Sequence, residues 1–489
     1  MFRILVLKEL KVYFTSPKFI STFIACSILI ILSVMVGIQD YKNDVKRYDT
    51  ARQLERQVLE ERTSWAYIGT RAFITPDPMR IFVSGITNDI GRFSDVSATE
   101  QVTLRSSTYS NDPIFAVFRL LDLNFIFLIV LSLFAILFTY DSINGERESG
   151  TLRLTFSNAV PRVKYIAAKF AGAWLGLVIP LLVPMLVVVL MVILSKVPFE
   201  ARHWLDFTLF AGVAVGYFSF FIALGIFVSS MTRRANVSFL ILLVAWVSLT
   251  LIVPRIGVMA ASKIIQVPSA AEVNALADAF SKDQWKQYTE GLIKTSRERN
   301  SLMADMTEEE REVFQDENEW NWMEESDRVR KEMQTNIKDH SRRLQEEHTN
   351  QLIEQERLAF LFVRVSPASA FQLATMNIAG TDTGLKPRYQ DAIENYRDTF
   401  LDHAAVKEKE SGGGMGGISI NFDTEKGISV STPRDRPTID ISDMPMFMPP
   451  ARTIGSVISE TMTDLVLLVI YTVGALAAAF VAFLRYDVR

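Results

Sequence analysis

Six long apolar runs constrain this sequence more than any other feature. Each is close to the roughly 20 mostly apolar residues that a helix needs to cross the hydrocarbon core of a bilayer. The six runs are Phe19–Ile38, Leu123–Tyr140, Phe170–Leu194, Leu205–Ser229, Val237–Val258 and Leu465–Leu484. The first run is too long for the apolar part of a signal peptide, and no small-residue cleavage site follows it, so we interpret it as a retained span. The sequence therefore predicts an all-α polytopic membrane protein with six transmembrane helices.

Lysine and arginine gather in the short segments on one side of these runs. They lie in the N-terminal segment 1–18, the connection 141–169, the short connection after the fourth run and the tail 485–489. Basic short loops stay in the cytoplasm, and an even number of spans puts both termini on one side. We therefore expect a multi-pass protein of the cell (inner) membrane with both termini cytoplasmic. Segments 39–122 and 260–463 then lie outside, because long segments translocate largely regardless of charge.

The two outside segments are rich in helical patterns. Charged residues with apolar residues at helical intervals predict helices over Asp40–Arg71, Ser269–Met303, Glu308–Val363 and Tyr389–Lys409. Thr307 followed by Glu310 fits a capping box, so a helix is expected to begin there. Alternating residues in Ile418–Asn421 and Ile428–Ser431 predict a small β-hairpin. We expect the two segments to form one largely helical extracytoplasmic domain.

Composition argues against several chemistries. The single cysteine, Cys26, lies in the first run, and the four histidines are scattered, so we expect neither disulfides nor a metal site. The methionines of Met444–Pro450 could be Cu(I) ligands, but packing is the favoured interpretation. No HExxH or GxSxG motif marks a catalytic site, and no GxxxxGK[ST] loop binds ATP. Asp122, Asp206 and Asp464 stand at the outer ends of spans, which disfavours a proton relay through the membrane.

Two span features leave alternatives open. Pro180 and Pro184 predict a kink in the third span, which is either a gating element or a passive bend. Gly212, Gly216 and Gly225 of the fourth span suit close packing of helices, within one chain or across a dimer.

The connection 141–169 carries the most informative motif. Glu146-x-Glu148-x-Gly150-Thr151-Leu152 is followed by Ser157, Pro161, Lys164-Tyr165 and Lys169. This pattern resembles the ABC-2 type transporter permease family. The resemblance implies that the loop forms a coupling helix in a groove of a cytoplasmic ATPase. The residues then assigned to coupling are Glu146, Arg147, Glu148, Gly150, Thr151, Leu152, Ser157 and Pro161. A charged loop that only anchors two spans is the alternative.

Two further segments resemble the same family. Lys8-Glu9-Leu10, Tyr13-Phe14 and Ser16-Pro17-Lys18-Phe19 are similar to its amphipathic elbow helix before the first span. The elbow residues implied are Lys8, Glu9, Ser16 and Pro17. Ser366-Pro367-Ala368, Phe371-Gln372 and Ala379-Gly380-Thr381-Asp382 are similar to the subgroup with a large outside insertion before the last span.

The resemblance implies a permease subunit that borrows its ATPase. ATP and Mg would be bound by separate P-loop ATPase subunits, and this chain would hold no cofactor. The partners expected are the ATPase, the lipid bilayer, a second permease in a homodimer or heterodimer, and an extracytoplasmic protein, but no nucleic acid. Export or extraction of a substrate is the first expectation, and mechanotransmission to an outside partner is the second. A receptor or scaffold is the rival, although the chain offers no cytoplasmic signalling domain.

Overall fold

The computed structural model describes residues 2–65, 68–98, 102–108, 121–158, 160–304, 306–410, 419–423, 427–431 and 438–485. The chain divides into two compact units. The first comprises Met1–Ile252 and Ser366–Arg489, and the second comprises Val253–Val365. Of the tail predicted at 485–489, only Arg485 belongs to the described residues.

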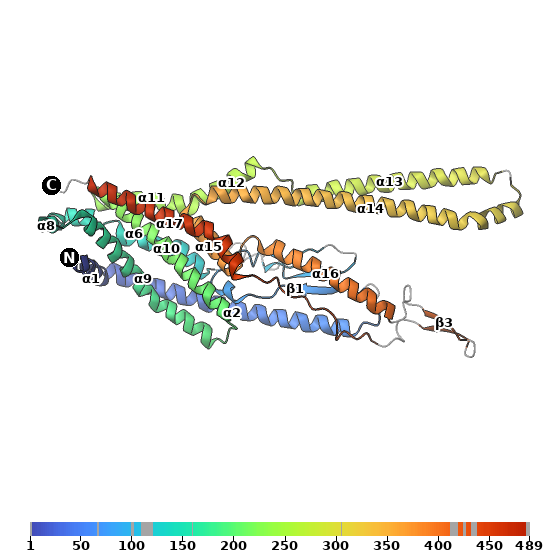
Figure 1. Cartoon of the computed structure of the whole chain (residues 1–489), viewed down its shortest axis with the longest axis horizontal. Helices are drawn as coiled ribbons and strands as arrows, with labels where there is room; N and C mark the ends of the chain where they lie inside the picture. The colour runs from blue at the N-terminus through green and yellow to red at the C-terminus, as the bar shows by residue number, and fades with distance from the viewer. Residues whose placement is uncertain are drawn as a thin grey trace. The chain divides into compact units, whose positions relative to one another are not determined.

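Six helices within the described ranges are long and apolar enough to cross a membrane. They confirm the polytopic all-α class and extend beyond the six predicted runs. Their bounds are Pro17–Glu60, Leu123–Glu148, Arg162–Leu194, Ala201–Met231, Ala235–Ile264 and Ile454–Leu484. The first is α2 (Pro17–Glu60), and the second joins α5 (Leu123–Phe125), η2 (Ile126–Leu131), α6 (Ser132–Thr139) and α7 (Asn144–Glu148). The third is α9 (Arg162–Leu194), and the fourth is α10 (Ala201–Met231). The fifth joins α11 (Ala235–Val247), η3 (Ser248–Ile252) and α12 (Val253–Ile264), and the sixth is α17 (Ile454–Leu484). Figure 1 labels α2, α6, α9, α10, α11, α12 and α17.

The second and fifth of these helices contain a π-helical stretch, η2 and η3 respectively. Such π turns are rare and occur mostly as short interruptions of α-helices. The indole nitrogen of Trp246 donates to Ser132 Oγ at 2.8 Å, which joins the fifth helix to the second. The boundary between the two units falls in the fifth helix, directly after η3.

Helix α2 does not stop at the end of the first apolar run. It continues through the charged residues after Ile38 and ends at Glu60, because no proline or turn sequence interrupts it. The prediction of helix as far as Arg71 is wrong over its last residues. Thr70–Phe73 instead forms β1, which pairs antiparallel with β2 (Phe93–Val96). The sequence Thr70-Arg71-Ala72-Phe73 does not alternate apolar and polar residues, so it gives no periodic signal of a strand.

A second apolar cluster packs beyond the spans in the first unit. Leu59 in the last turn of α2 and Trp65 just after it pack in one cluster with Ile393 and Phe400 of α16 (Leu385–Glu410). Figure 1 shows α2, β1 and α16 side by side. The short helix η1 (Pro78–Ile81) also contacts α2. Segment 39–122 therefore packs with the C-terminal part of segment 260–463.

A short helix and two short strands also belong to this unit. Helix α15 (Pro367–Ala379) is buried, and Ser366 caps it. Strands β3 (Ser419–Asp423) and β4 (Gly427–Ser431) form the β-hairpin that the sequence predicts.

The second unit is dominated by two paired helices, α13 (Ala270–Leu302) and α14 (Glu308–Val363). Thr307 Oγ1 accepts from the Glu310 amide at 3.4 Å, and the Glu310 carboxylate accepts from the Thr307 amide at 2.9 Å, which confirms the predicted capping box. At ~1.5 Å per residue, α14 alone is about 84 Å long. The expectation of one outside domain is corrected, because this hairpin forms a unit of its own.

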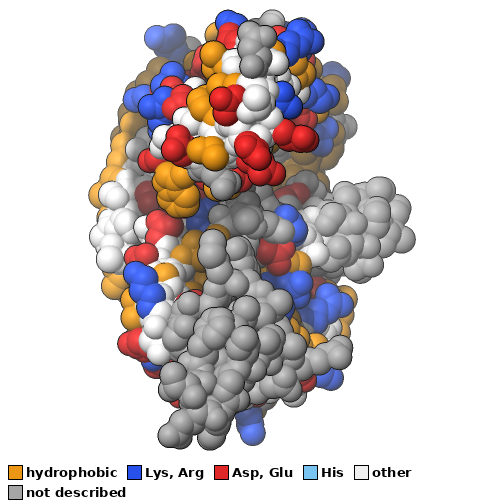
Figure 2. Space-filling view, turned by 90° about the vertical axis from the view of Figure 1, so that its right-hand side faces the viewer, with side chains coloured by type: hydrophobic (Ala, Val, Ile, Leu, Met, Phe, Trp, Pro, Cys, Tyr) orange, Lys and Arg blue, Asp and Glu red, His pale blue; other side chains and the backbone are white. Residues whose placement is uncertain are grey.

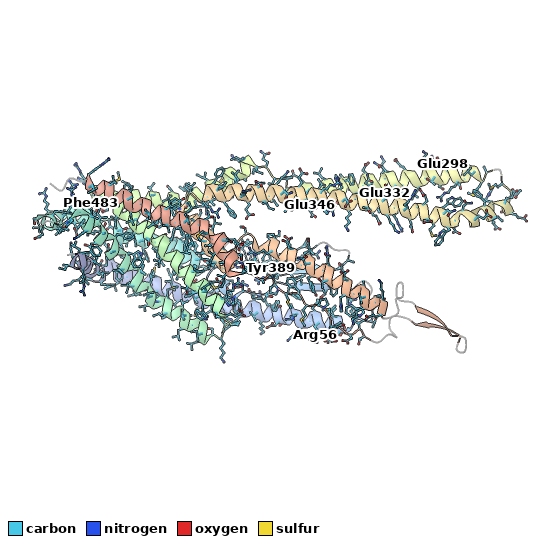
Figure 3. All side chains as sticks on the ribbon, viewed as in Figure 1. Arg56, Glu298, Glu332, Glu346, Tyr389 and Phe483 are labelled. Carbon is cyan, nitrogen blue, oxygen red and sulfur yellow. The ribbon has the colours of Figure 1, made fainter. Side chains whose placement is uncertain are left out.

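The surface of the hairpin is mostly charged. Glu298, Glu332 and Glu346 are exposed and project from it in Figure 3. Figure 2 shows acidic and basic side chains interspersed with small hydrophobic patches. Such a surface suits helices packed on each other in water.

Candidate functional site

The N-terminal helix α1 (Phe2–Phe14) packs closely on the start of α9. The approach depends on two glycines of α9. A Cβ atom on Gly172 would lie 2.5 Å from the Cβ of Glu9, and one on Gly176 would lie 3.2 Å from the ring of Tyr13. The Tyr13 hydroxyl donates to the Phe138 carbonyl at 3.2 Å. Burial, together with nearby carboxylates, raises the pKa of Tyr13, so this hydroxyl keeps its proton.

Four charged side chains meet where α1, α7 and α9 come together. The ammonium of Lys169, whose side chain is 4% exposed, lies 2.9 Å from Glu9 Oε1 and 2.8 Å from Glu146 Oε1. Lys8 Nζ donates to the same Glu146 oxygen at 2.6 Å, and the Tyr165 hydroxyl donates to the other at 2.6 Å. Two cations and two carboxylates balance, so the cluster is neutral when all four are ionised. Buried charges are tolerated only in such paired sets.

Helix α7 also forms hydrogen bonds with residues at the ends of the fourth and fifth spans. Glu148 Oε1 accepts from the amide of Ala235, at the first residue of α11, at 2.9 Å. A carboxylate at a helix N-terminus satisfies a free amide and opposes the positive end of the helix dipole. Asn144 Nδ2 donates to Thr232 Oγ1 at 2.9 Å, just after α10 ends. A single five-residue helix thus contacts four other helices of the unit.

A glycine turn connects α7 to α8 (Thr151–Ser157). Gly150 has φ = 73°, a left-handed conformation that strains residues with a side chain. Leu152 is buried, and the Phe156 ring lies 5.2 Å from that of Tyr165 and 5.8 Å from that of Phe483. Helix α8 is therefore packed on α9 and on the end of α17, with its opposite face open.

The open face of α8 combines polar groups with one leucine. Arg153 and Ser157 are exposed, and Leu154 is 68% exposed. Leu154 therefore leaves apolar surface on the face of α8 that lies opposite its contacts with α9 and α17.

Comparison with protein families decides the identity of this arrangement. The model of the ABC-2 family transporter proteins matches residues 3–488. The chain belongs to the ABC-2 transporter family. A comparison with curated protein sequences finds no match. Membership makes the chain a multi-pass membrane subunit of an ABC transporter.

The structure of this ABC-2 protein separates the predicted coupling residues into two groups. Glu146 and Leu152 are covered and hold α7 and α8 in the fold, and Glu148 is exposed but binds the Ala235 amide. The others are exposed, namely Gly150, Thr151, Ser157 and Pro161, except that Arg147 is half-buried. Of the predicted elbow residues, Lys8 and Glu9 join the charge cluster. Ser16 and Pro17 instead begin α2.

Several residues of this ABC-2 site were missed as site residues. Lys169 and Tyr165 belong to the motif that carries the resemblance, yet their contacts with Glu146 were not predicted. Leu154 and Phe156 were also missed, although apolar residues in a connection of charged and polar ones were a usable signal. Arg162 Nη1 donates to the Leu484 carbonyl at 2.6 Å, and nothing in the sequence indicates this pairing.

Proposed function

We propose that this ABC-2 protein couples ATP hydrolysis on a separate P-loop ATPase to the export or extraction of a substrate. The observation that supports the proposal is the position of Glu146. One carboxylate joins α7 to α1 through Lys8 and to α9 through Lys169 and Tyr165. A force applied to α7 and α8 therefore reaches several spans together, as rigid-body coupling requires.

The docking surface in this proposal is the open face of α8. Its centre is Leu154, flanked by Arg153 and Ser157. ATP and Mg are bound by the ATPase, and the chain works as a homodimer or heterodimer with both termini in the cytoplasm. Glu146 is not a docking residue in this proposal, because its carboxylate is engaged within the chain.

Co-purification of an ATPase tests the docking surface. Leu154→Arg is expected to lower the amount of P-loop ATPase recovered with the full chain, since a charge replaces an exposed apolar contact. Leu276→Arg is the matched control, because Leu276 is also exposed but lies on α13. Equal recovery with both variants, or no ATPase with the unaltered chain, would contradict the proposal.

A second variant separates docking from coupling. A Cβ on Gly150 would meet no described atom within 4 Å, but its left-handed φ of 73° strains any residue with a side chain, so Gly150→Trp distorts the turn without a clash at the Cβ. We expect that variant to fold, to retain the charge cluster and to lose substrate-dependent ATPase stimulation. Unchanged stimulation would remove the turn from the coupling route.

Mechanotransmission to an outside protein is the second candidate. The hairpin of α13 and α14 exposes two tryptophans, Trp285 and Trp320, and the Trp320 side chain is 74% exposed. Exposed tryptophans are enriched in protein contact surfaces. Under mechanotransmission, Trp320→Ser leaves ATPase recovery and basal hydrolysis intact but abolishes the cellular function. Under export, the same variant leaves all three unchanged.

A further inference from the structure

A cavity of about 420 Å³ lies in the first unit, outside the charge cluster and beyond the apolar part of α2. Its walls are the far end of α2, strand β1, helix α16 and the segment Ile441–Phe447. The volume falls within the range of roughly 300–1,000 Å³ that is usual for small-molecule sites.

Most of the wall is apolar and aromatic. Tyr396 and Phe447 pack edge to face with centroids 5.6 Å apart, and Tyr48 and Phe73 do so at 6.4 Å. Leu59 completes this surface from the end of α2. A wall of this kind receives a hydrocarbon or aromatic group.

Three arginines line the same cavity, and two of them have carboxylate partners. Arg56 pairs with Glu60 at 2.9 Å, and Arg71 pairs with Asp95 at 3.0 Å. Arg52 has no carboxylate partner among the described residues. Its Nη2 donates to the thioether sulfur of Met446 at 3.0 Å, and a thioether is a weak acceptor.

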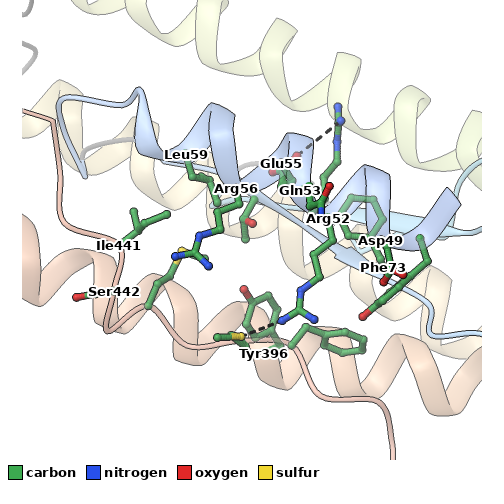
Figure 4. A pocket seen from close by; sticks show the side chains of 16 residues that line it. Asp49, Arg52, Gln53, Glu55, Arg56, Leu59, Phe73, Tyr396, Ile441 and Ser442 are labelled. Carbon is green, nitrogen blue, oxygen red and sulfur yellow. Dashed lines mark hydrogen bonds and ion pairs between the residues drawn. The ribbon is translucent and has the colours of Figure 1, made fainter. Parts of the chain in front are cut away.

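Arg52 is exposed to water, and of the three arginines that line the cavity it is the one whose guanidinium no described carboxylate holds. Figure 4 shows the Arg52 side chain extending from α2 toward Tyr396, beside the aromatic wall. A guanidinium offers five donors in a planar fork that matches a carboxylate or a phosphate. Two carboxylates also line the cavity. Glu55 lies 3.8 Å from Arg71, and Asp49 is exposed to water.

We propose that this cavity binds an amphipathic anion, with its carboxylate or phosphate on Arg52 and its apolar part against the aromatic wall. The proposal does not depend on how the chain couples to an ATPase. In this proposal the ligand's anionic oxygen replaces the Met446 sulfur as the acceptor of the Arg52 hydrogen bond.

Photolabelling of the full chain in phosphatidylcholine nanodiscs tests the proposal. The probe is decanoic acid that carries a diazirine in its chain, and labelled peptides are identified by mass spectrometry. We expect labelling of peptides from α16 and Ile441–Phe447. Arg52→Gln should lower it about tenfold, in line with the loss of a charge-assisted contact. Asp49→Asn should raise labelling, because it removes a repelling charge.

Arg47→Gln is the matched control, since Arg47 is also an exposed arginine of α2 but does not line the cavity. It should leave labelling unchanged. The proposal is overturned if Arg52→Gln labels like the unaltered chain, or if the methyl ester of the probe labels these peptides equally well. Thermal unfolding of each variant shows that the fold is retained, and an unfolded Arg52→Gln chain leaves the decision to Asp49→Asn.

Competition distinguishes the chemistry of the head group. Decanoate and decyl phosphate should both displace the probe, and the stronger competitor identifies the preferred head. Inorganic phosphate should displace it poorly, because it cannot use the aromatic wall. Displacement by inorganic phosphate as strong as that by decyl phosphate would contradict an amphipathic ligand.

Discussion

Replacement of Lys169 by methionine tests whether the charge cluster holds α1 and α7 on α9. Methionine keeps much of the apolar stem but removes the ammonium that Glu9 and Glu146 share. Glu146 retains Lys8 at 2.6 Å and the Tyr165 hydroxyl at 2.6 Å. Glu9 retains only the distant ammonium of Lys8, at 3.8 Å. The penalty therefore comes mainly from one buried carboxylate.

Removal of one partner from a buried ion pair destabilises a protein by about 3–5 kcal/mol. Because Lys8 remains nearby, we expect Lys169→Met to lower the free energy of unfolding by about 3 kcal/mol, at the low end of that range. The double variant Glu9→Gln with Lys169→Met is neutral again. It should lie within about 1 kcal/mol of the unaltered chain, since neutral replacements of buried pairs are often tolerated.

A double-mutant cycle of unfolding free energies, measured by steric trapping in bicelles, checks this expectation. Lys164→Met is the control, because Lys164 is an exposed lysine of α9, and its change should stay within about 0.5 kcal/mol. The reasoning is refuted if Lys169→Met is as mild as the control. It is also refuted if the double variant is as unstable as the single one.

Two further predictions concern helix contacts. Gly172→Leu should lower the unfolding free energy by about 2–4 kcal/mol, because its Cβ would lie 2.5 Å from Glu9. Gly212→Ala is the control and should change thermal stability little, because its Cβ would meet no described atom within 4 Å. The pKa of Glu310 is lowered by its hydrogen bonds to Thr307, so this cap stabilises α14 above the ordinary glutamate pKa and is lost as pH falls through the lowered value. Hydrogen exchange of the amides at the start of α14, relative to its intrinsic rate, should therefore become faster as the pH falls below about 4. In Glu310→Gln this exchange should depend less on pH.

The features that the sequence predicts well are those that depend on residues close together in the chain. The capping box at Thr307, the helix Glu308–Val363 and the six apolar runs all depend on local composition or spacing.

Contacts between distant residues could not be predicted in the same way. Lys8 and Glu146 lie 138 positions apart, and no periodicity relates them. The pairing of β1 with β2 depends on a register that four-residue strands do not encode. The glycines of the fourth span show both outcomes. A Cβ on Gly225 would overlap the Thr139 side chain, which confirms close packing within the chain, whereas a Cβ on Gly212 or Gly216 would meet no described atom of this chain within 4 Å. Packing within the chain is therefore not the reason for Gly212 and Gly216, and contact across a dimer stays a prediction.

The unbroken course of α2 has a mechanical consequence. The helix continues for about 33 Å past Ile38 at ~1.5 Å per residue, and its far end forms one wall of the cavity at Arg52. Such a rod acts as a lever, so that a tilt of about 10° at Ile38 displaces its tip by roughly 6 Å. A ligand that prefers one width of the cavity would then favour one inclination of the first span. By reciprocity, any event that inclines the span would change the affinity for that ligand by the same factor.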